Sequence, residues 1–141
     1  MSMGTLVDTS VLSESARAKP DGGVLAWMDE QRTGSLYLSV ITIGEVAAGI
    51  AGAGDDVLRA RLTRWLEFDV RRAFLGRILV VDERIAQAWG TIHAGNRKQP
   101  VNVSDELIAA TAHVNGLTVA TRNIRDFERC GVPTFNPWEF E

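Results

Sequence analysis

The chain has 141 residues, 45% of them hydrophobic and 23% charged, which suits one globular domain spanning residues 1–141 with a full core. The net charge of −3 argues against a protein that coats nucleic acid through bulk positive charge. No apolar run reaches the roughly 20 residues of a membrane span. A single cysteine, Cys130, and no secretory signal predict a cytoplasmic protein without disulfides.

The first half of the chain alternates short apolar runs with helical patterns. Strands are expected at Thr5–Val7 and Leu36–Leu38. Turn residues at 20–23 predict a break between two short helices. The helices expected in this half are Val11–Arg17, Val24–Arg32, a segment from Thr42 to Gly52, and Asp55–Phe74 as one amphipathic helix or a pair. The apolar stripe of the last segment consists of Leu58, Leu62, Trp65, Leu66 and Phe68.

The second half repeats the alternation. Further strands are expected at Ile78–Val81, Leu117–Ala120 and Pro133–Phe135. One helix should begin after Asp82 and run to about Lys98, and another should cover Asp105–Asn115, capped by Ser104 or Asn102. Strands that alternate with helices predict an α/β/α sandwich with a central, mainly parallel sheet of four to five short strands.

Four acidic residues each lie next to an apolar run. They are Asp8, Glu45, Asp105 and Asp126. In an open parallel sheet the strand ends converge on one crevice, so acids far apart in sequence can share one small volume. Crowded carboxylates repel one another and are stabilised by a cation, which indicates a Mg²⁺ or Mn²⁺ site.

Each of these acids also has a structural alternative. Asp8 fits a helix N-cap, and Glu45 with Thr42 fits a capping box. Asp105 lies in a first helical turn, where the dipole favours negative charge, and Asn123 with Asp126 could cap a short helix. Taken together, these structural alternatives are less convincing than each is alone, because all four acids lie at the same kind of position, next to an apolar run.

Other chemistries find less support in the sequence. The two histidines, His93 and His113, have no partner at metal-ligand spacing. A phosphatase-like α/β domain would need an Asp-x-Asp pattern, but Asp8 is followed by Thr9 and Ser10. A module that only binds a partner stays open, although the intact set of acids argues against it.

Four ordered motifs resemble those of PIN domains. They are 6–14 (LVDTSVLSE), 38–45 (LSVITIGE), 105–112 (DELIAATA) and 117–127 (LTVATRNIRDF). The closing segment 135–138 (FNPW) is similar to that of the VapC and FitB branch, the toxins of bacterial toxin–antitoxin pairs. Ser10 stands where the first motif usually has Asn.

This resemblance implies a Mg²⁺- or Mn²⁺-dependent endoribonuclease toxin that cleaves RNA by metal-activated water. Asp8 and Asp105 would be direct metal ligands, and Glu45, Asp126 and Asn123 secondary ones. Supporting hydroxyls would come from Thr9, Ser10 and Thr121. The resemblance also implies a homodimer and a cognate antitoxin of the VapB or FitA type. Its alternatives are a housekeeping RNA-processing PIN nuclease and a non-catalytic PIN module that binds a partner.

Overall fold

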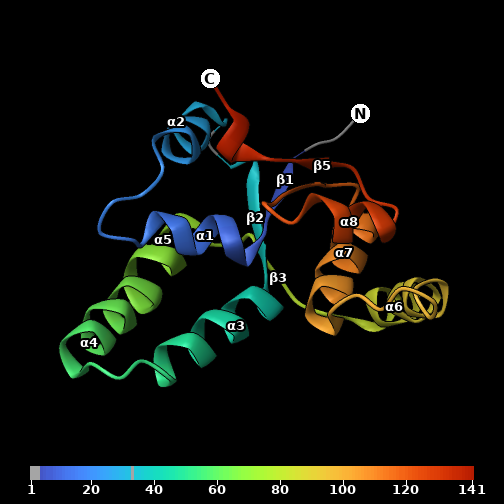
Figure 1. Ribbon diagram of the computed structural model, residues 1–141, viewed down its shortest axis with the longest axis horizontal. Coiled ribbons are helices and arrows are strands. Elements are labelled where there is room, and N and C mark those ends of the chain that lie inside the picture. Colours follow the sequence, from blue (N-terminus) through green and yellow to red (C-terminus); the bar gives the residue numbers. More distant parts are fainter. Residues whose placement is uncertain (1–3, 33) are drawn as a thin grey trace.

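A single parallel sheet forms the centre of the molecule. The computed structural model describes residues 4–32 and 34–141. Five strands lie in the order β3-β2-β1-β4-β5, and every pairing is parallel (Figure 1). They are β1 (Thr5–Val7), β2 (Leu36–Ser39), β3 (Ile78–Leu79), β4 (Thr118–Ala120) and β5 (Thr134–Phe135). The expected parallel α/β architecture is confirmed, and β3 is two residues shorter than predicted.

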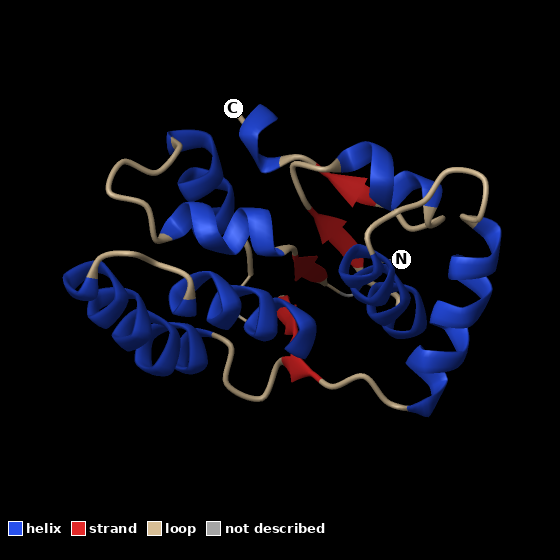
Figure 2. Cartoon of the chain, turned by 60° about the horizontal axis from the view of Figure 1, so that its bottom comes forward, coloured by secondary structure: helices blue, strands red, loops and turns tan. Residues whose placement is uncertain are grey.

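Helices cover both faces of this sheet, which gives the expected three layers (Figure 2). The first half of the chain supplies α1 (Thr9–Ser15), α2 (Gly22–Glu30), α3 (Val40–Ala51), α4 (Asp56–Arg64), η1 (Trp65–Val70) and α5 (Arg71–Ala73). The second half supplies α6 (Glu83–Gly95), α7 (Val103–Asn115), α8 (Ile124–Arg129) and η2 (Pro137–Glu139). None of the helices in the described ranges is long and apolar enough to cross a membrane.

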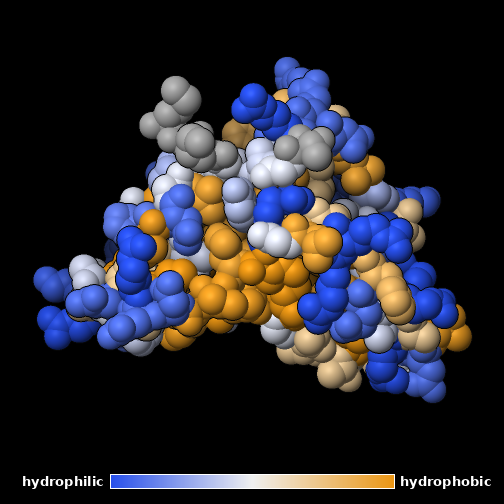
Figure 3. Space-filling model, turned by 180° about the vertical axis from the view of Figure 1, so that it is seen from behind, coloured by the Kyte–Doolittle hydropathy of each residue, from blue (hydrophilic) through white to orange (hydrophobic). Residues whose placement is uncertain are grey.

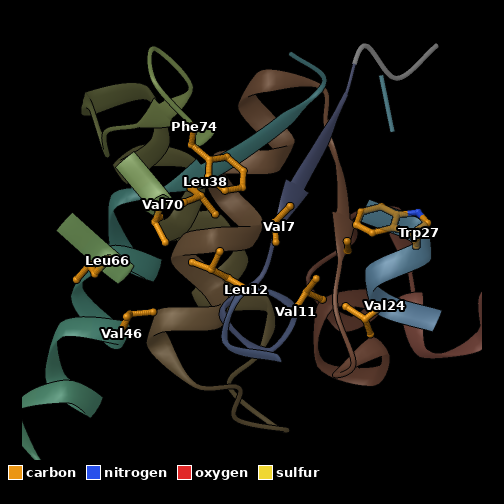
Figure 4. Close-up of a cluster of buried hydrophobic side chains, with 11 residues drawn as sticks. Val7, Val11, Leu12, Val24, Trp27, Leu38, Val46, Leu66, Val70 and Phe74 are labelled. Atoms are coloured by element: carbon orange, nitrogen blue, oxygen red, sulfur yellow. The ribbon is translucent and has the colours of Figure 1, made fainter. Parts of the chain in front are cut away.

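Two hydrophobic clusters pack on opposite faces of the sheet. Successive strand residues point to opposite faces, so Val7 joins one cluster and Leu6 the other. The first cluster contains side chains of α1, α2 and η1 (Figure 4). The second packs α7 and α8 against β1 and β4 through residues such as Ile108 and Phe127. Both faces of β1 are therefore buried, as a central parallel strand requires.

Several helix boundaries differ from the sequence prediction. Helix α1 begins at Thr9 rather than Val11, directly after β1. Helix α2 includes Gly22 and Gly23, because the Asp21 side chain accepts a hydrogen bond from the Val24 amide and caps the helix there. Helix α6 ends at Gly95, three residues before the predicted end. In α2 a cap that the sequence offered outweighed the apolar periodicity.

The long segment 55–74 is a helix interrupted by a π-helical turn. Residues Trp65–Val70 form this turn between α4 and α5. The wider spacing rotates the following side chains, so Leu66 is buried but Phe68 is 61% exposed. The prediction that Phe68 lies on the apolar stripe is therefore wrong.

Candidate metal site and adjoining groove

The candidate site lies where the chain reverses direction across the sheet. From β1 the chain winds outward through β2 and β3, and it then returns to the other side of β1 with β4. Open α/β sheets bind ligands at such a switch point, outside the carboxyl ends of the strands. Asp8 follows β1 and Thr121 follows β4, and the Thr121 hydroxyl donates a 2.8 Å hydrogen bond to Oδ2 of Asp8.

Asp8 is nearly buried, with 4% of its surface exposed. It stands at the N-cap position of α1, but its side chain makes no capping hydrogen bond. Its Oδ2 instead accepts hydrogen bonds from the hydroxyls of Ser10, at 2.9 Å, and Thr121. The carboxylate is thus held by short side chains that face the site, and the capping alternative does not describe it.

Glu45 lies in the middle of α3 and cannot cap it. The helix begins at Val40, and Ser39 caps it by accepting a 3.0 Å hydrogen bond from the Ile41 amide. The predicted start at Thr42 and its capping box are therefore wrong. Glu45 Oε1 accepts a 2.6 Å hydrogen bond from the Thr9 hydroxyl, which ties α3 to α1 beside Asp8.

Asn123 joins the two remaining acids. Its Nδ2 donates hydrogen bonds to Oδ2 of Asp105 at 3.1 Å and to Oδ2 of Asp126 at 2.8 Å. The Asn123 side chain makes no capping bond for α8, so the alternative of a simple Asn-x-x-Asp cap is excluded. Asp105 lies in the first turn of α7, which is capped by Asn102 and not by Ser104.

The Asp105 carboxyl group is affected by the charges of the other acids. Partial burial, followed by the negative charges of Asp8 and Glu45, raises the pKa of Asp105 to about 6. The charge of Asp126 acts in the same direction, while the hydrogen bond from Asn123 opposes it. Three of the predicted acids therefore act on the carboxyl group of the fourth, although the four come from separate segments.

The donor chemistry of this site fits a hard divalent cation. Carboxylate, amide and hydroxyl oxygens are the ligands that Mg²⁺ and Mn²⁺ prefer. Across residues 4–32 and 34–141, however, no three Asp, Glu, His or Cys side chains converge closely enough to hold a metal as they stand. The reason is visible in the hydrogen bonds, because protein N–H and O–H groups occupy the positions facing each carboxylate. A cation between Asp105 and Asp126 would require the Asn123 side chain to turn its N–H group away, so that its amide oxygen faces the ion.

A groove of about 630 Å³ opens beside Thr9 and Glu45. Most of its lining is apolar and comes from α1, α3, α4 and the π-helical turn, as in Ile50, Leu58 and Trp65. Leu12 of α1 is a core residue with 2% exposure and does not line this groove. The groove leads directly to the acidic site, so a ligand lying in it can reach the carboxylates.

Sequence reasoning missed a buried polar cluster on the other side of Asp105. Glu106 is fully buried and accepts 2.9 Å hydrogen bonds from Nδ1 of His93 and Nδ2 of Asn96. Burial alone would raise the pKa of Glu106, but the hydrogen bonds from Asn96 and His93 outweigh it and lower the pKa below its usual value. The available signal was the pair Asp105-Glu106 itself, since adjacent helix residues point about 100° apart.

The histidines take no part in the acidic site. His93 serves Glu106, and His113 lies near the opposite end of α7. Cys130 is buried, and its thiol accepts a long 3.7 Å contact from Asn96.

Comparisons with a family model, with relatives and with solved structures all point to the same family. The family model described as "PIN domain" matches residues 5–132. The chain is 38% identical to VapC ribonuclease Y4jK of Sinorhizobium fredii, covering 95% of this chain and 97% of that protein. It is 39% identical to toxin FitB of Neisseria gonorrhoeae, covering 94% and 97%. The crystal structure of FitAcB from Neisseria gonorrhoeae superposes with a TM-score of 0.89 at 37% identity, covering 96% of this chain and 99% of that chain.

Proposed function

The chain belongs to the PIN domain family, and we propose that it is a Mg²⁺- or Mn²⁺-dependent endoribonuclease toxin of the bacterial cytoplasm. The observation that carries this proposal is that burial and the charges of Asp8, Glu45 and Asp126 together raise the pKa of the Asp105 carboxyl group to about 6. Relatives named as a VapC ribonuclease and as toxin FitB support the class of activity.

In this proposal the position of each acid determines whether it binds the cation or accepts a proton. Asp8 and Asp105 bind the cation directly, while Asp126 and Asn123 complete its surroundings. A bound divalent cation supplies Lewis-acid stabilisation of the phosphate oxygens. Glu45 lies at the mouth of the groove, where its carboxylate can accept a proton from an attacking water. The hydroxyls of Thr9, Ser10 and Thr121 fix the orientation of Glu45 and Asp8 through the hydrogen bonds described above.

The groove supplies the proposed place for the antitoxin. Its apolar lining suits the apolar face of a helix, which would dock through side chains spaced by one helical turn. The groove ends at Thr9 and Glu45, so a Lys or Arg that follows such a helix would reach the carboxylates and compete with the cation. A toxin of this kind would then be inactive whenever its partner is bound.

We also propose that the toxin is a homodimer. The back of the molecule carries apolar side chains gathered in its hollowed centre, between two polar arms (Figure 3). Two large apolar residues next to the edge strand β3, Leu75 and Val80, are 79% and 64% exposed. An edge strand with exposed apolar neighbours favours association with a second copy. Sedimentation of the purified chain tests this point.

The direct test of the proposed activity is RNA cleavage by the purified chain. We expect cleavage of single-stranded RNA in Mg²⁺ or Mn²⁺ and none in excess chelator. Full activity in chelator, or no activity with either metal, would overturn the proposal.

A growth assay distinguishes a toxin from other PIN proteins. Expression of this chain alone should arrest a bacterial culture, and Asp8→Asn should relieve the arrest. Normal growth in the presence of soluble wild-type chain that cleaves RNA in vitro would assign a housekeeping RNA-processing role instead. Normal growth with no cleavage in vitro would leave a non-catalytic binding module.

A further inference from the structure

Arg122 is an exposed arginine beside the acidic site, and no carboxylate in residues 4–32 and 34–141 forms an ion pair with it. Arg122 directly follows Thr121, and its amide donates a 3.3 Å hydrogen bond to the Ser10 hydroxyl. Ser10 and Thr121 both donate to Oδ2 of Asp8. The backbone of Arg122 is therefore fixed relative to Asp8 by two consecutive hydrogen bonds.

The guanidinium of Arg122 lies over the ring of Trp138, 4.8 Å from its centroid. This is a cation–π contact, and within the described residues no side-chain hydrogen bond joins the guanidinium to a protein acceptor. Within the described part of the chain, no carboxylate forms an ion pair with Arg122. Other arginines do find acidic partners there, for example Arg59 with Asp56 and Arg71 with Glu67.

Trp138 provides a rigid support for this cation. It lies in η2, where its amide donates a 3.0 Å hydrogen bond to the Asn136 side chain, and its ring packs against the core cluster of α1 and α2. A long arginine side chain normally loses much rotamer freedom on binding a ligand. Because Trp138 already restricts Arg122, less of that entropy is lost when a ligand arrives.

We propose that Arg122, supported by Trp138, is a substrate-positioning residue that holds a phosphate of single-stranded RNA next to the phosphate being cleaved. This inference rests on the proposed nuclease function. The chain has a net charge of −3 and its site is acidic, so RNA is repelled unless a local cation attracts it. A planar guanidinium also matches a phosphate through two parallel hydrogen bonds, which a lysine does not provide.

A structural alternative assigns Arg122 only to fastening the segment of Trp138 onto the body. The two roles differ in what they change. Fastening affects the melting temperature, whereas phosphate binding affects the salt dependence of RNA affinity. Each phosphate contact to a single strand contributes about 0.7 to the slope of log K against log salt.

The experiment measures binding of a fluorescent single-stranded RNA by anisotropy at several salt concentrations, in an Asp105→Asn background that prevents cleavage. Arg122→Ala should weaken binding roughly tenfold or more at low salt and reduce the slope by about 0.7. Arg122→Lys should keep the slope but recover only part of the affinity. Trp138→Phe should behave like the parent, and Trp138→Leu should weaken binding while the slope stays.

Arg84→Ala is the matched control. Arg84 is an exposed arginine at the start of α6, next to His113 near the far end of α7, and its removal should change neither affinity nor slope. An unchanged slope in Arg122→Ala, with or without a lower melting temperature, would overturn the positioning role alone. If the Asp105→Asn parent binds no RNA and the wild type cleaves none, the proposed function fails as well.

Discussion

The hydroxyl of Thr9 donates a 2.6 Å hydrogen bond to Oε1 of Glu45, although 36 positions separate the two residues. Thr9 is the first residue of α1 and Glu45 lies in the second turn of α3. The contact turns the Glu45 carboxylate toward the site and the mouth of the groove. It also leaves Glu45 without any role in capping its own helix.

Glu45→Gln distinguishes a catalytic role of the Glu45 charge from a purely structural role of its hydrogen bond. The Gln carbonyl oxygen can still accept the Thr9 hydrogen bond, so we expect normal folding by circular dichroism and an unchanged or higher melting temperature. If Glu45 accepts the proton of the attacking water, the cleavage rate should fall by about 10²-fold or more. Glu30→Gln on the exposed end of α2 is the control. Wild-type cleavage by Glu45→Gln would remove Glu45 from the chemistry.

The pKa of Asp105 predicts how the stability of the metal-free protein depends on pH. The folded pKa of about 6 lies above the usual value of 3.8, so the folded state holds the proton more tightly than the unfolded state. This group destabilises the fold above pH 6, and the effect disappears as the pH falls toward 4. In chelator, the melting temperature should therefore rise as the pH is lowered from 7.5 to 5.

Asp105→Asn should remove most of this pH dependence and raise the melting temperature at pH 7.5, while abolishing cleavage in Mn²⁺. Asp69→Asn, an exposed acid of the π-helical turn, should leave both properties as in the wild type. A melting temperature that stays flat from pH 7.5 to 5 in the wild type would contradict the assigned cause.

Asn123→Asp tests whether the amide bridge takes the place of a cation. The change replaces two donated hydrogen bonds by a further negative charge between Asp105 and Asp126. In chelator we expect a lower melting temperature at pH 7.5, because the carboxylates then repel one another unopposed. Mn²⁺ should raise the melting temperature of Asn123→Asp more than that of the wild type. Gln87→Glu on α6 makes the same change of charge far from the site, and an equal response to Mn²⁺ in both variants would refute the prediction.

Glu106→Gln tests the buried cluster behind Asp105. Its lowered pKa means that the ionised carboxylate stabilises the folded state above pH 4.5, and this contribution is lost as the pH falls through the folded pKa. Replacing it by a neutral amide should reduce the free energy of unfolding at pH 7 by about 1–3 kcal/mol, since one buried partner is left poorly satisfied. Urea unfolding measures this difference, which should shrink as the pH falls below 4.5. A loss at pH 7 no larger than that of Glu30→Gln would contradict it.

Much of the sheet and of the acidic cluster could be predicted from local sequence patterns. The apolar runs before Asp8 and Asn123 marked β1 and β4 because parallel buried strands need continuous hydrophobic side chains. The start of α3 was misplaced because Thr42 and Glu45 match a capping box, while Ser39, which caps the helix, closes a strand. The partners of Glu106 could not be found from sequence, since they depend on how α6 packs against α7 and not on any spacing.

The pairing of Arg122 with Trp138 was equally invisible in the sequence. The two residues lie in different segments, and only the order β1-β4-β5 brings the loop after β4 under the segment that follows β5. Contacts of this kind are set by topology. The π-helical turn was missed for a similar reason, because a helix of ordinary pitch satisfies the same apolar pattern.

The position of β1 between β2 and β4 has a consequence for synthesis of the chain. The hydrogen bond from Thr121 to Asp8 spans 113 positions, so a nascent chain that has passed Asp105 still lacks the strand that completes the frame around Asp8. Native pairings so distant in sequence form late, after the intervening segments have been made. A polypeptide released before β4 therefore carries three of the four acids without an assembled site. Assembly of the acidic site is therefore confined to molecules whose translation has run nearly to completion.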